Sequence, residues 1–432
     1  MRLQAWEDRG TRGFVGPIAG GCDMKAGIGC CDKQDAFSSG REAARSAVQN
    51  GNLRTPGLAL AFCSGQLNHE EFFRGVKETA GDIPVIGGST TGIITNDFLS
   101  YQGSPAGVML LQLEELDCQI ASVDGLDADE KKAGRGLVQE LSPSDRDRLL
   151  LMFYDSIKVP ASPASPPVMN ASPPLIAGIE SVLKAGVPVI GAGLIGDYQF
   201  SRTRQFCGAS VSEQCVVGAL ISGPVSVYYS IMHGCSPFDG KYRTITRMQD
   251  AVIQELDGRP IVDTIDESYG GRGWRTQHPL NLLTIGVNHG EKFLFREDNF
   301  VNRLITGVLP DNSGIGIFEP DLKEGMEIQF MLRDGGMMIE SARSNSESLM
   351  ESITADGKTP LCALYIDCAG RAAEQSNTET EEAAEVQRVM NACHTPLLGF
   401  YSGVEVAPIL GKSTGLDWTG VLMVLAQDKA NG

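Results

Sequence analysis

The residues best suited to chemistry in this sequence follow an apolar run near its end. Residues 362–367 (CALYID) read as a buried strand, and Cys368 and Arg371 follow directly. A cation near the thiol would lower the pKa of Cys368 and make it a candidate nucleophile. Arg371 carries a planar fork of donors that suits a carboxylate. The alternatives are a cysteine that is simply packed at a strand end and an arginine that pairs with an acidic side chain of the protein.

Two further polar residues lie in apolar surroundings. Glu405 stands between two valines, where a carboxylate must be partly exposed or paired. It could face a ligand amine, pair with Arg371, or lie on the solvated face of an alternating strand. His233 ends an apolar strand in the motif His-Gly-Cys235, and it is either a hydrogen-bonded structural residue or a ligand contact. We count His233 and Cys235 among the candidate ligand-binding residues.

A glycine-rich segment could bind an anion. Gly88, Ser89 and Thr90 follow the run PVIG and could offer backbone N–H groups and hydroxyls to a ligand. Gly191 lies in a second copy of that run and is a candidate for the same reason. The segment lacks the Gly-Lys-Ser/Thr ending of a P-loop, and the sequence contains no HExxH zinc motif. Tight turns are the alternative explanation for these glycines.

A strand–helix–strand unit recurs three times and predicts the fold class. Each copy has an apolar run, an amphipathic helix, a proline-led strand and a further apolar strand. The proline-led strands begin at residues 84 (PVIGG), 188 (PVIGA) and 396 (PLLGF). We expect an α/β (mixed α+β) protein whose repeated units form mixed sheets flanked by helices, in two halves.

Hydrophobic patterning also predicts individual elements of the copies. The periodicity favours helical stretches at 69–80, 175–185 and 250–256, and a further helix with an acidic first turn is expected at 381–393. Successive apolar runs are expected to pair as strands, 107–111 with 118–123 and 216–221 with 225–232.

The repeats and composition divide the chain into three parts. We expect an N-terminal segment over residues 1–35, a first half over 36–235 with two copies, and a second half over 236–432. The first half contains a proline-rich loop at 159–174, which we expect to be extended and mobile because proline neither continues a helix nor joins a central strand. The second half contains a different α+β region at 240–336 and the third copy at 360–426.

These motifs resemble those of FIST domains, named for F-box and intracellular signal transduction. Residues 58–65 (LALAFCSG) and 84–92 (PVIGGSTTG) are similar to the N-terminal half of such a domain. Four later motifs are similar to the C-terminal half: 233–237 (HGCSP), 255–260 (ELDGRP), 368–371 (CAGR) and 399–405 (GFYSGVE). The resemblance implies a sensory module that binds a small ligand, amino acids among them, and that acts through a signalling partner.

Composition excludes several other classes of protein. The net charge of −18 repels phosphate backbones and anionic lipids, which disfavours nucleic-acid and membrane binding. The 51 glycines recur after strand-like runs, as a pocket built from loops would require. Eleven cysteines, with no signal-peptide pattern and no apolar run long enough for a membrane span, predict reduced thiols in a cytoplasmic protein.

We therefore expect a soluble sensory protein that binds a small polar molecule, such as an amino acid or a carboxylate. Its pocket would lie where the strand-end loops converge, with Arg371 addressing the carboxylate and Glu405 an amine. One alternative is a haem-binding gas sensor, a role associated with some FIST-like proteins, with His233 as the candidate axial ligand. The other is an enzyme that uses Cys368 as its nucleophile on a small molecule. The sequence itself requires no metal or cofactor.

Overall fold

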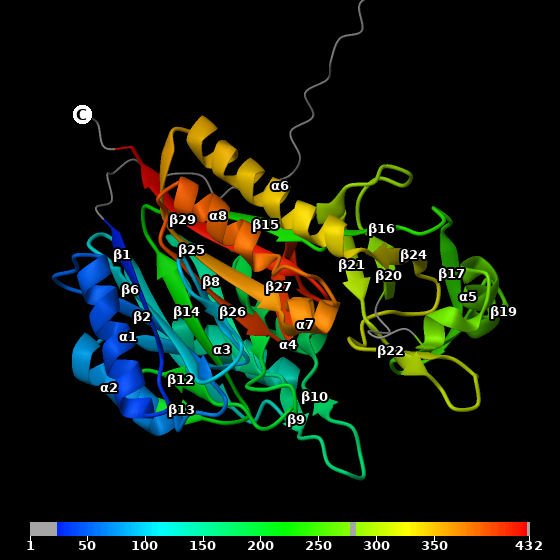
Figure 1. The fold of residues 1–432 in the computed structure, drawn as a ribbon, viewed down its shortest axis with the longest axis horizontal. Helices are drawn as coiled ribbons and strands as arrows, with labels where there is room; N and C mark the ends of the chain where they lie inside the picture. The colour runs from blue at the N-terminus through cyan, green and yellow to red at the C-terminus, as the bar shows by residue number, and fades with distance from the viewer. Residues whose placement is uncertain (1–23, 277–281, 430–432) are drawn as a thin grey trace, which may run out of the picture.

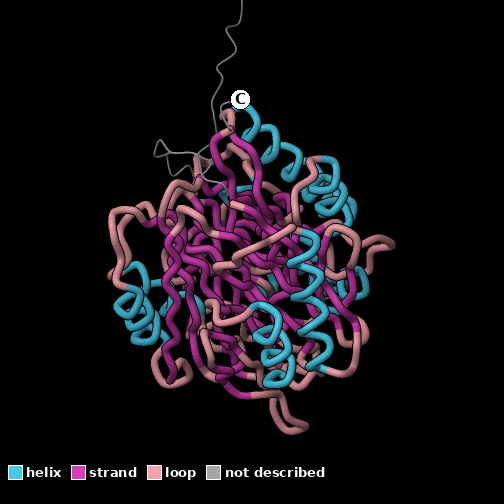
Figure 2. Tube along the Cα trace, turned by 90° about the vertical axis from the view of Figure 1, so that its left-hand side faces the viewer, coloured by secondary structure: helices cyan, strands magenta, loops and turns pink. Residues whose placement is uncertain are grey.

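The computed structural model describes residues 24–276 and 282–429, which form a large repeated body and a smaller lobe (Figure 1). Residues 1–23 of the expected N-terminal segment lie outside the described residues. The predicted class is confirmed: the described chain has mixed sheets with helices packed on them. Figure 2 shows the strands gathered at the centre and the helices around them.

Each of the three copies follows one order of elements: strand, helix, strand, helix, strand, hairpin and strand. The first copy contains β1 (Lys25–Asp32), α1 (Ala36–Asn50), β2 (Leu58–Ser64), α2 (His69–Ala80), β3 (Val85–Thr90), the hairpin β4 (Ile93–Thr95) and β5 (Leu99–Ser100), and β6 (Pro105–Gln112). The second contains β7 (Asp117–Asp124), α3 (Glu130–Leu141), β8 (Asp147–Asp155), α4 (Ser172–Glu180), β11 (Val189–Leu194), the hairpin β12 (Gln205–Cys207) and β13 (Ser210–Ser212), and β14 (Cys215–Ser222). The third contains β15 (Ser226–Met232), α6 (Gly335–Ala355), β25 (Lys358–Cys368), α8 (Ala383–Ala392), β26 (Leu397–Ser402), the hairpin β27 (Val404–Ile409) and β28 (Lys412–Leu416), and β29 (Gly420–Asp428).

The hairpin of each copy pairs with the sheet of another copy. The hairpin of the first copy pairs β4 with β26, that of the second pairs β12 with β3, and that of the third pairs β27 with β11, all antiparallel. The sheets therefore run β1-β6-β2-β3-β12-β13, β7-β14-β8-β11-β27-β28 and β15-β29-β25-β26-β4-β5. This exchange closes the three copies into a ring in which every sheet contains residues from two copies.

The three sheets meet at three buried phenylalanine rings, one from each sheet. Phe62 on β2 stacks on Phe400 of β26 with ring centroids 4.1 Å apart, and Phe153 of β8 meets Phe62 edge-on at 5.1 Å. All three side chains have no exposed surface. Aromatic rings in such contacts contribute more than their buried area alone, so the cluster holds the three sheets together.

The smaller lobe is inserted into the third copy, between β15 and α6, and lies at the right of Figure 1. Its elements are β16 (Cys235–Pro237), β17 (Arg243–Gln249), β18 (Val252–Leu256), β19 (Arg259–Pro260), α5 (Ile261–Tyr269), β20 (Leu283–Asn288), β21 (Phe300–Arg303), β22 (Ile305–Val308), β23 (Ile315–Ile317) and β24 (Glu327–Arg333). They form one sheet with α5 packed beside β18. We call this region the inserted lobe.

The expected pairing of successive runs was wrong. β7 (Asp117–Asp124) pairs with β14 rather than β6, and β15 pairs with β29 rather than β14. The connection after β6 reads Leu113-Glu-Glu-Leu116, which contains no residue that favours the positive φ of a tight hairpin turn. The chain instead crosses to start the next sheet.

Of the predicted helices, 69–80 is confirmed as α2 and 381–393 contains α8, while those at 175–185 and 250–256 need correction. The helix expected at 175–185 runs from Ser172 to Glu180, because Pro173 and Pro174 fit the first turn, where their missing N–H groups cost nothing. The stretch 250–256 contains β18, which follows Asp250 with its positive φ of 51°.

Within the proline-rich segment 159–174, the short strand β10 (Val168–Met169) pairs with β9 (Ile157–Val159), and the last residues begin α4. β1 lies within residues 1–35 and forms the edge of the first sheet. The division of the chain at residues 35 and 235 stays a prediction.

Candidate functional site

Arg371, expected to address a ligand carboxylate, is fully buried and bound by the protein itself. Its Nε donates to Asp367 Oδ1 at 3.0 Å, and its Nη2 pairs with Glu382 Oε2. Its Nη1 donates to the backbone carbonyls of His233 and Trp418, both at 3.0 Å. All three guanidinium nitrogens therefore have partners, and the fork ties the end of β25 to the start of the inserted lobe.

Glu405 lies near this network on β27 and is also fully buried. Its Oε1 accepts from Ser402 Oγ at 2.8 Å and its Oε2 from the N–H of Thr419 at 3.3 Å. Arg371 is not among the hydrogen-bond partners of Glu405 in the described chain. Burial raises the pKa of Glu405 well above its ordinary value, which favours the neutral acid.

His233 and Cys235 belong to a second buried network at the base of the inserted lobe. The N–H of Cys235 donates to His233 Nδ1 at 2.9 Å, so Nδ1 is unprotonated and Nε2 donates to the carbonyl of Glu297 at 2.9 Å. Burial lowers the pKa of His233, which agrees with this neutral tautomer. Because both ring nitrogens are engaged, this arrangement offers none to a haem iron.

Cys368 is half-buried at the end of β25. Burial raises the pKa of its thiol well above the ordinary value. Arg371 forms ion pairs with Asp367 and Glu382. Its guanidinium therefore does not lower the pKa of the Cys368 thiol, as the spacing in the sequence had suggested. The geometry favours a neutral thiol here.

The glycine-rich segment forms the buried strand β3 rather than an open loop. Ser89 Oγ accepts from the N–H of Arg204 at 2.7 Å, and Thr90 Oγ1 donates to the carbonyl of Tyr401 at 2.7 Å. A Cβ on Gly88 would lie 2.2 Å from the carbonyl oxygen of Arg204, and one on Gly191 would lie 1.7 Å from that of Met152. These glycines let neighbouring strands approach closely.

The structure thus brings Arg371, Glu405, Cys368, His233 and Cys235 together in the third copy and its junction with the inserted lobe. Gly88, Ser89 and Thr90 lie in the first copy, and Gly191 in the second. All of these residues have partners within the protein or pack against its backbone, and none lines either of the two cavities described next. Their role in ligand binding stays a prediction.

The first cavity is a cleft of about 250 Å³ between the inserted lobe and the repeated body. We call it the lobe cleft. The inserted lobe contributes Val287, His289, Val301 and Met326, whereas α4 contributes Glu180 and the β27–β28 hairpin contributes Ile409, Lys412 and Thr414. Ligand sites occur preferentially at such junctions, with mostly apolar walls and a few polar groups.

The polar groups of the lobe cleft differ in charge and availability. Lys412 is exposed and makes no ion pair within residues 24–276 and 282–429. His289 is exposed by its solvent-accessible surface, yet partial desolvation and the nearby cations Arg303 and Lys412 lower its pKa, so its ring is neutral at pH 7. Asp321 forms an ion pair with Arg303, whose Nε donates to Asp321 Oδ1 at 2.7 Å. Glu180 Oε1 accepts from the N–H of Ser413 at 3.1 Å.

An acidic pair lies behind the lobe cleft. The N–H of Ser172, at the start of α4, donates to Glu319 Oε2 at 3.2 Å, and Arg303 Nη1 lies 3.8 Å from Asp417 Oδ1. Burial and, to a smaller extent, the nearby carboxylate of Asp417 together raise the pKa of Glu319 to about 8, while burial raises the pKa of Asp417 to about 6. Glu319 is therefore mostly protonated at pH 7, which limits the buried negative charge.

Sequence reasoning missed Lys412 and its neighbours, although a signal existed. Residues 411–415 read GKSTG, which matches the ending of a P-loop, but Val406 stands where the first glycine of that motif belongs. The same residues match the spacing G-x-S-x-G. They form the turn and second strand of a hairpin, and Ser413 Oγ accepts from the N–H of Val189 at 3.3 Å, so Ser413 does not form an exposed nucleophile elbow.

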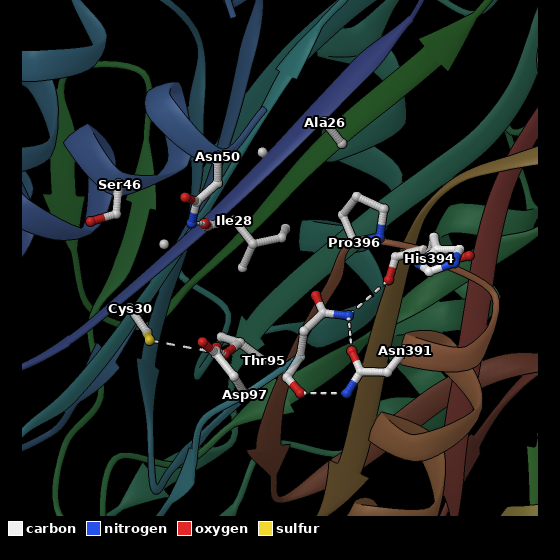
Figure 3. Close-up of a pocket in the computed structure, with 14 residues that line it drawn as sticks. Ala26, Ile28, Cys30, Ser46, Asn50, Thr95, Asp97, Asn391, His394 and Pro396 are labelled. Carbon is white, nitrogen blue, oxygen red and sulfur yellow. Dashed lines mark hydrogen bonds between the residues drawn. The ribbon is translucent and has the colours of Figure 1, made fainter. Parts of the chain in front are cut away.

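The second cavity, of about 610 Å³, lies along β1 (Figure 3). We call it the edge cavity. Ser46 and Asn50 of α1 flank it, and residues 95–97 and 391–396 form the opposite wall. In that wall Asn96 Nδ2 donates to Asn391 Oδ1 and Asn391 Nδ2 donates to the carbonyl of Asn96, at 2.9 and 2.8 Å. These paired amides join the β4–β5 turn to the end of α8.

The described residues contain neither a cluster of metal ligands nor a helix suited to cross a membrane. No three His, Cys, Asp or Glu side chains are grouped there as metal ligands would be. None of the described helices is both long and apolar enough to cross a membrane.

Comparison with known proteins identifies related sequences. The profile of the FIST N domain matches residues 57–259, and that of the FIST C domain matches residues 271–408. Two uncharacterized proteins, from Mycobacterium bovis and Mycobacterium tuberculosis, are 25% identical to this chain over 245 residues. The match covers 56% of this chain and 61% of each relative, so it spans about three fifths of the relatives' length.

Similarity to solved structures is weak. A cyanuric acid hydrolase from A. caulinodans aligns over 94% of this chain and 100% of its own, with 10% identity and a TM-score of 0.34. The PurL protein of T. maritima complexed with ADP aligns over 97% of this chain and 74% of its own, with 8% identity and a TM-score of 0.23. Scores this low support no argument about this protein.

Proposed function

Because the chain belongs to the FIST family, whose domains are associated with signal transduction and small-ligand sensing, we propose that it is a sensor of a small carboxylate and that its ligand binds in the lobe cleft. An α-amino acid with an apolar side chain is the ligand that the cleft fits best. The observation that carries this proposal is the ammonium group of Lys412, which forms no ion pair with another described residue and lies at a cleft whose walls are mainly apolar.

The carboxylate of the ligand would pair with Lys412. Thr414 and the neutral ring of His289 line the same cleft and could supply hydrogen bonds beside the ion pair. A charge-assisted hydrogen bond in a partly enclosed site contributes about 1.5–3 kcal/mol, which makes this contact the main source of selectivity for an acid.

The rest of an amino acid would find complementary groups in the cleft. Glu180 offers a carboxylate to the ligand's ammonium group, because α4 places this side chain in the lining. Val287, Val301 and Ile409 would surround the apolar side chain. Burying such a side chain contributes about 1.5–3 kcal/mol.

Ligand binding would act on the junction between the two parts of the molecule. One wall of the cleft belongs to the inserted lobe and the other to α4 and the β27–β28 hairpin. A ligand that contacts both walls stabilises the conformation in which the walls are close. The resulting shift between conformations would be the signal that the sensor transmits. The partner that receives the signal would be a separate protein.

Isothermal titration calorimetry with the twenty L-amino acids and a set of small carboxylic acids tests the proposal. At least one apolar amino acid should bind, and its C-terminal amide should bind at least about tenfold more weakly because it lacks the carboxylate. Lys412→Met should weaken binding similarly, whereas Lys131→Met, which removes an exposed lysine of α3, should not. Absence of heat with every compound, or equal binding by the two variants, would contradict the proposal.

A further inference from the structure

We propose that the edge cavity binds an extended, basic peptide segment of a partner protein, which adds to the free edge of β1 as a further strand. This inference concerns a site separate from the lobe cleft, and it does not depend on the ligand proposed there.

β1 is an edge strand, and the backbone groups that it turns outward can be identified. β1 pairs with β6 alone in the described chain. In β2, the N–H of Ala59 donates to the carbonyl of Pro84 beside β3 at 2.9 Å, so the odd-numbered residues of β2 face β3 and the even-numbered ones face β6. In the β2–β6 register the odd-numbered residues of β6 face β2, so its even-numbered residues face β1. In the β6–β1 register the odd-numbered residues of β1 then face β6. Ala26, Ile28 and Cys30 therefore turn their N–H and C=O groups to the free edge.

A side-chain contact supports this assignment. Asn50 Nδ2 donates to the carbonyl of Ile28 at 2.8 Å. The contact comes from the side of β1 that faces the edge cavity, where Figure 3 shows Asn50 beside Ile28. The N–H groups of Ala26, Ile28 and Cys30 and the carbonyls of Ala26 and Cys30 remain as a row of donors and acceptors.

The middle of β1 lacks the features that usually protect an edge strand. Proteins commonly blunt such edges with lysine, proline or bulges. Residues 26–31 read AGIGCC, with no charged residue and no proline, and β1 pairs with β6 in unbroken register. Gly27 and Gly29 allow α1 to pack closely against β1, because a Cβ at either position would lie within 2.0 Å of a carbonyl oxygen of that helix.

The edge cavity provides the space that an added strand needs. Its volume of about 610 Å³ lies beside the residues of β1 whose backbone groups face outward. Donors and acceptors that repeat every second residue along a strand match a peptide backbone, and this is the recognition mode in which an extended peptide joins a sheet edge. The residues to either side of β1 would then contact alternate side chains of the peptide.

The charge of the edge cavity selects a basic peptide. No lysine or arginine is among its lining residues, whereas Asp97 is exposed there and one oxygen of its carboxylate accepts from Thr95 Oγ1 at 3.2 Å. Figure 3 shows Asp97 on the wall opposite α1. The protein carries a net charge of −18, which attracts a cationic segment over a distance. A lysine or arginine side chain of the peptide would reach Asp97.

Fluorescence anisotropy with capped synthetic peptides tests the proposal. The probe is a labelled heptapeptide in which threonine and valine alternate and two positions are lysine. One control replaces both lysines with glutamate, and the other keeps the sequence but carries N-methyl groups on alternate amides. The full-length protein should bind the probe and should bind each control at least about tenfold more weakly. Equal binding of the N-methylated peptide, or no binding of the probe, would overturn the proposal.

Protein variants and amide exchange locate the site. Asp97→Asn should weaken the binding of the lysine probe, whereas Asp127→Asn, which alters an exposed acid elsewhere, should not. Hydrogen exchange at Ile28 and Cys30 should slow when the probe is bound, since their N–H groups would then be paired. Probe binding without this protection would overturn the assignment to β1. A dimer in analytical ultracentrifugation that protects the same amides without peptide would show that a second copy occupies the edge, and would also overturn it.

Discussion

Arg371 donates from Nη1 to the backbone carbonyl of His233 at 3.0 Å, which joins two residues that are 138 positions apart in the sequence. His233 stands at the start of the inserted lobe and Arg371 just after β25 of the third copy. The same guanidinium pairs with Asp367 and Glu382. The arginine that the sequence suggested for ligand binding thus holds the insertion against the body that carries it.

Removal of the Arg371 guanidinium should be strongly destabilising. Arg371→Met leaves the buried carboxylates of Asp367 and Glu382 without their cation, and breaking one partner of a buried pair costs about 3–5 kcal/mol. Arg388→Met, which removes surface ion pairs to Glu347 and Glu385, should cost less than about 1 kcal/mol. Equilibrium unfolding in urea measures both. Equal losses would show that the buried network does not carry this energy.

The acidic pair behind the lobe cleft should make stability fall as pH rises. Glu319 has its pKa raised to about 8 in the folded protein, above the ordinary 4.5, so the folded state holds a proton that the unfolded state releases. Its stabilising contribution is complete below about pH 4.5 and is lost as pH rises toward 8, at up to about 1.4 kcal/mol per pH unit.

Comparison with Glu319→Gln isolates this effect from that of other buried acids. The amide cannot ionise, so the free energy of unfolding of the variant should change less between pH 5 and 8 than that of the wild type. Urea titrations at several pH values provide the measurement. If the two proteins have parallel pH profiles, Glu319 is not the group that titrates.

Two glycine substitutions should act in opposite directions. Gly191→Ala in β11 would place a Cβ 1.7 Å from the carbonyl oxygen of Met152, so the parallel pair of strands would have to separate. Gly136→Ala in α3 meets its nearest atom, a methyl group of Val123, at 3.4 Å, and alanine favours a helix over glycine by about 1 kcal/mol. Thermal unfolding should show a loss for the first and a gain for the second. A stable Gly191→Ala protein would contradict the close approach of the strands.

Thiol labelling should distinguish Cys393 from Cys368. Cys393 is exposed at the end of α8, whereas Cys368 is half-buried and its pKa is raised well above the ordinary value. Iodoacetamide at neutral pH should therefore modify Cys393 first, as peptide mass spectrometry would detect. Preferential modification of Cys368 would instead support the hypothesis of a cysteine-dependent enzyme.

The repeated units could be predicted because their signal is local. The proline-led strands at 84, 188 and 396 and the amphipathic pattern of α2 lie within short windows of sequence. The exchange of hairpins could not be predicted, because it pairs strands from distant segments, such as Ile94 with Gly399. A short strand such as β4 carries no information about its distant partner.

The chemistry of the candidate residues depended on the same long-range contacts. The motif CAGR identified Arg371 as a cation near a thiol, but only the fold shows that Asp367, Glu382 and two carbonyls already occupy it. The lobe cleft combines His289, Lys412 and Glu180 from three distant segments. Their spacing in the sequence gives no hint that they meet.

A crystal structure of the protein with the amino acid or carboxylate that binds most tightly in calorimetry tests the central claim most directly. We predict electron density for the ligand in the lobe cleft, with its carboxylate within hydrogen-bond distance of Lys412 Nζ and its apolar side chain against Val287 and Ile409. A ligand bound elsewhere, with the lobe cleft empty, would contradict the account.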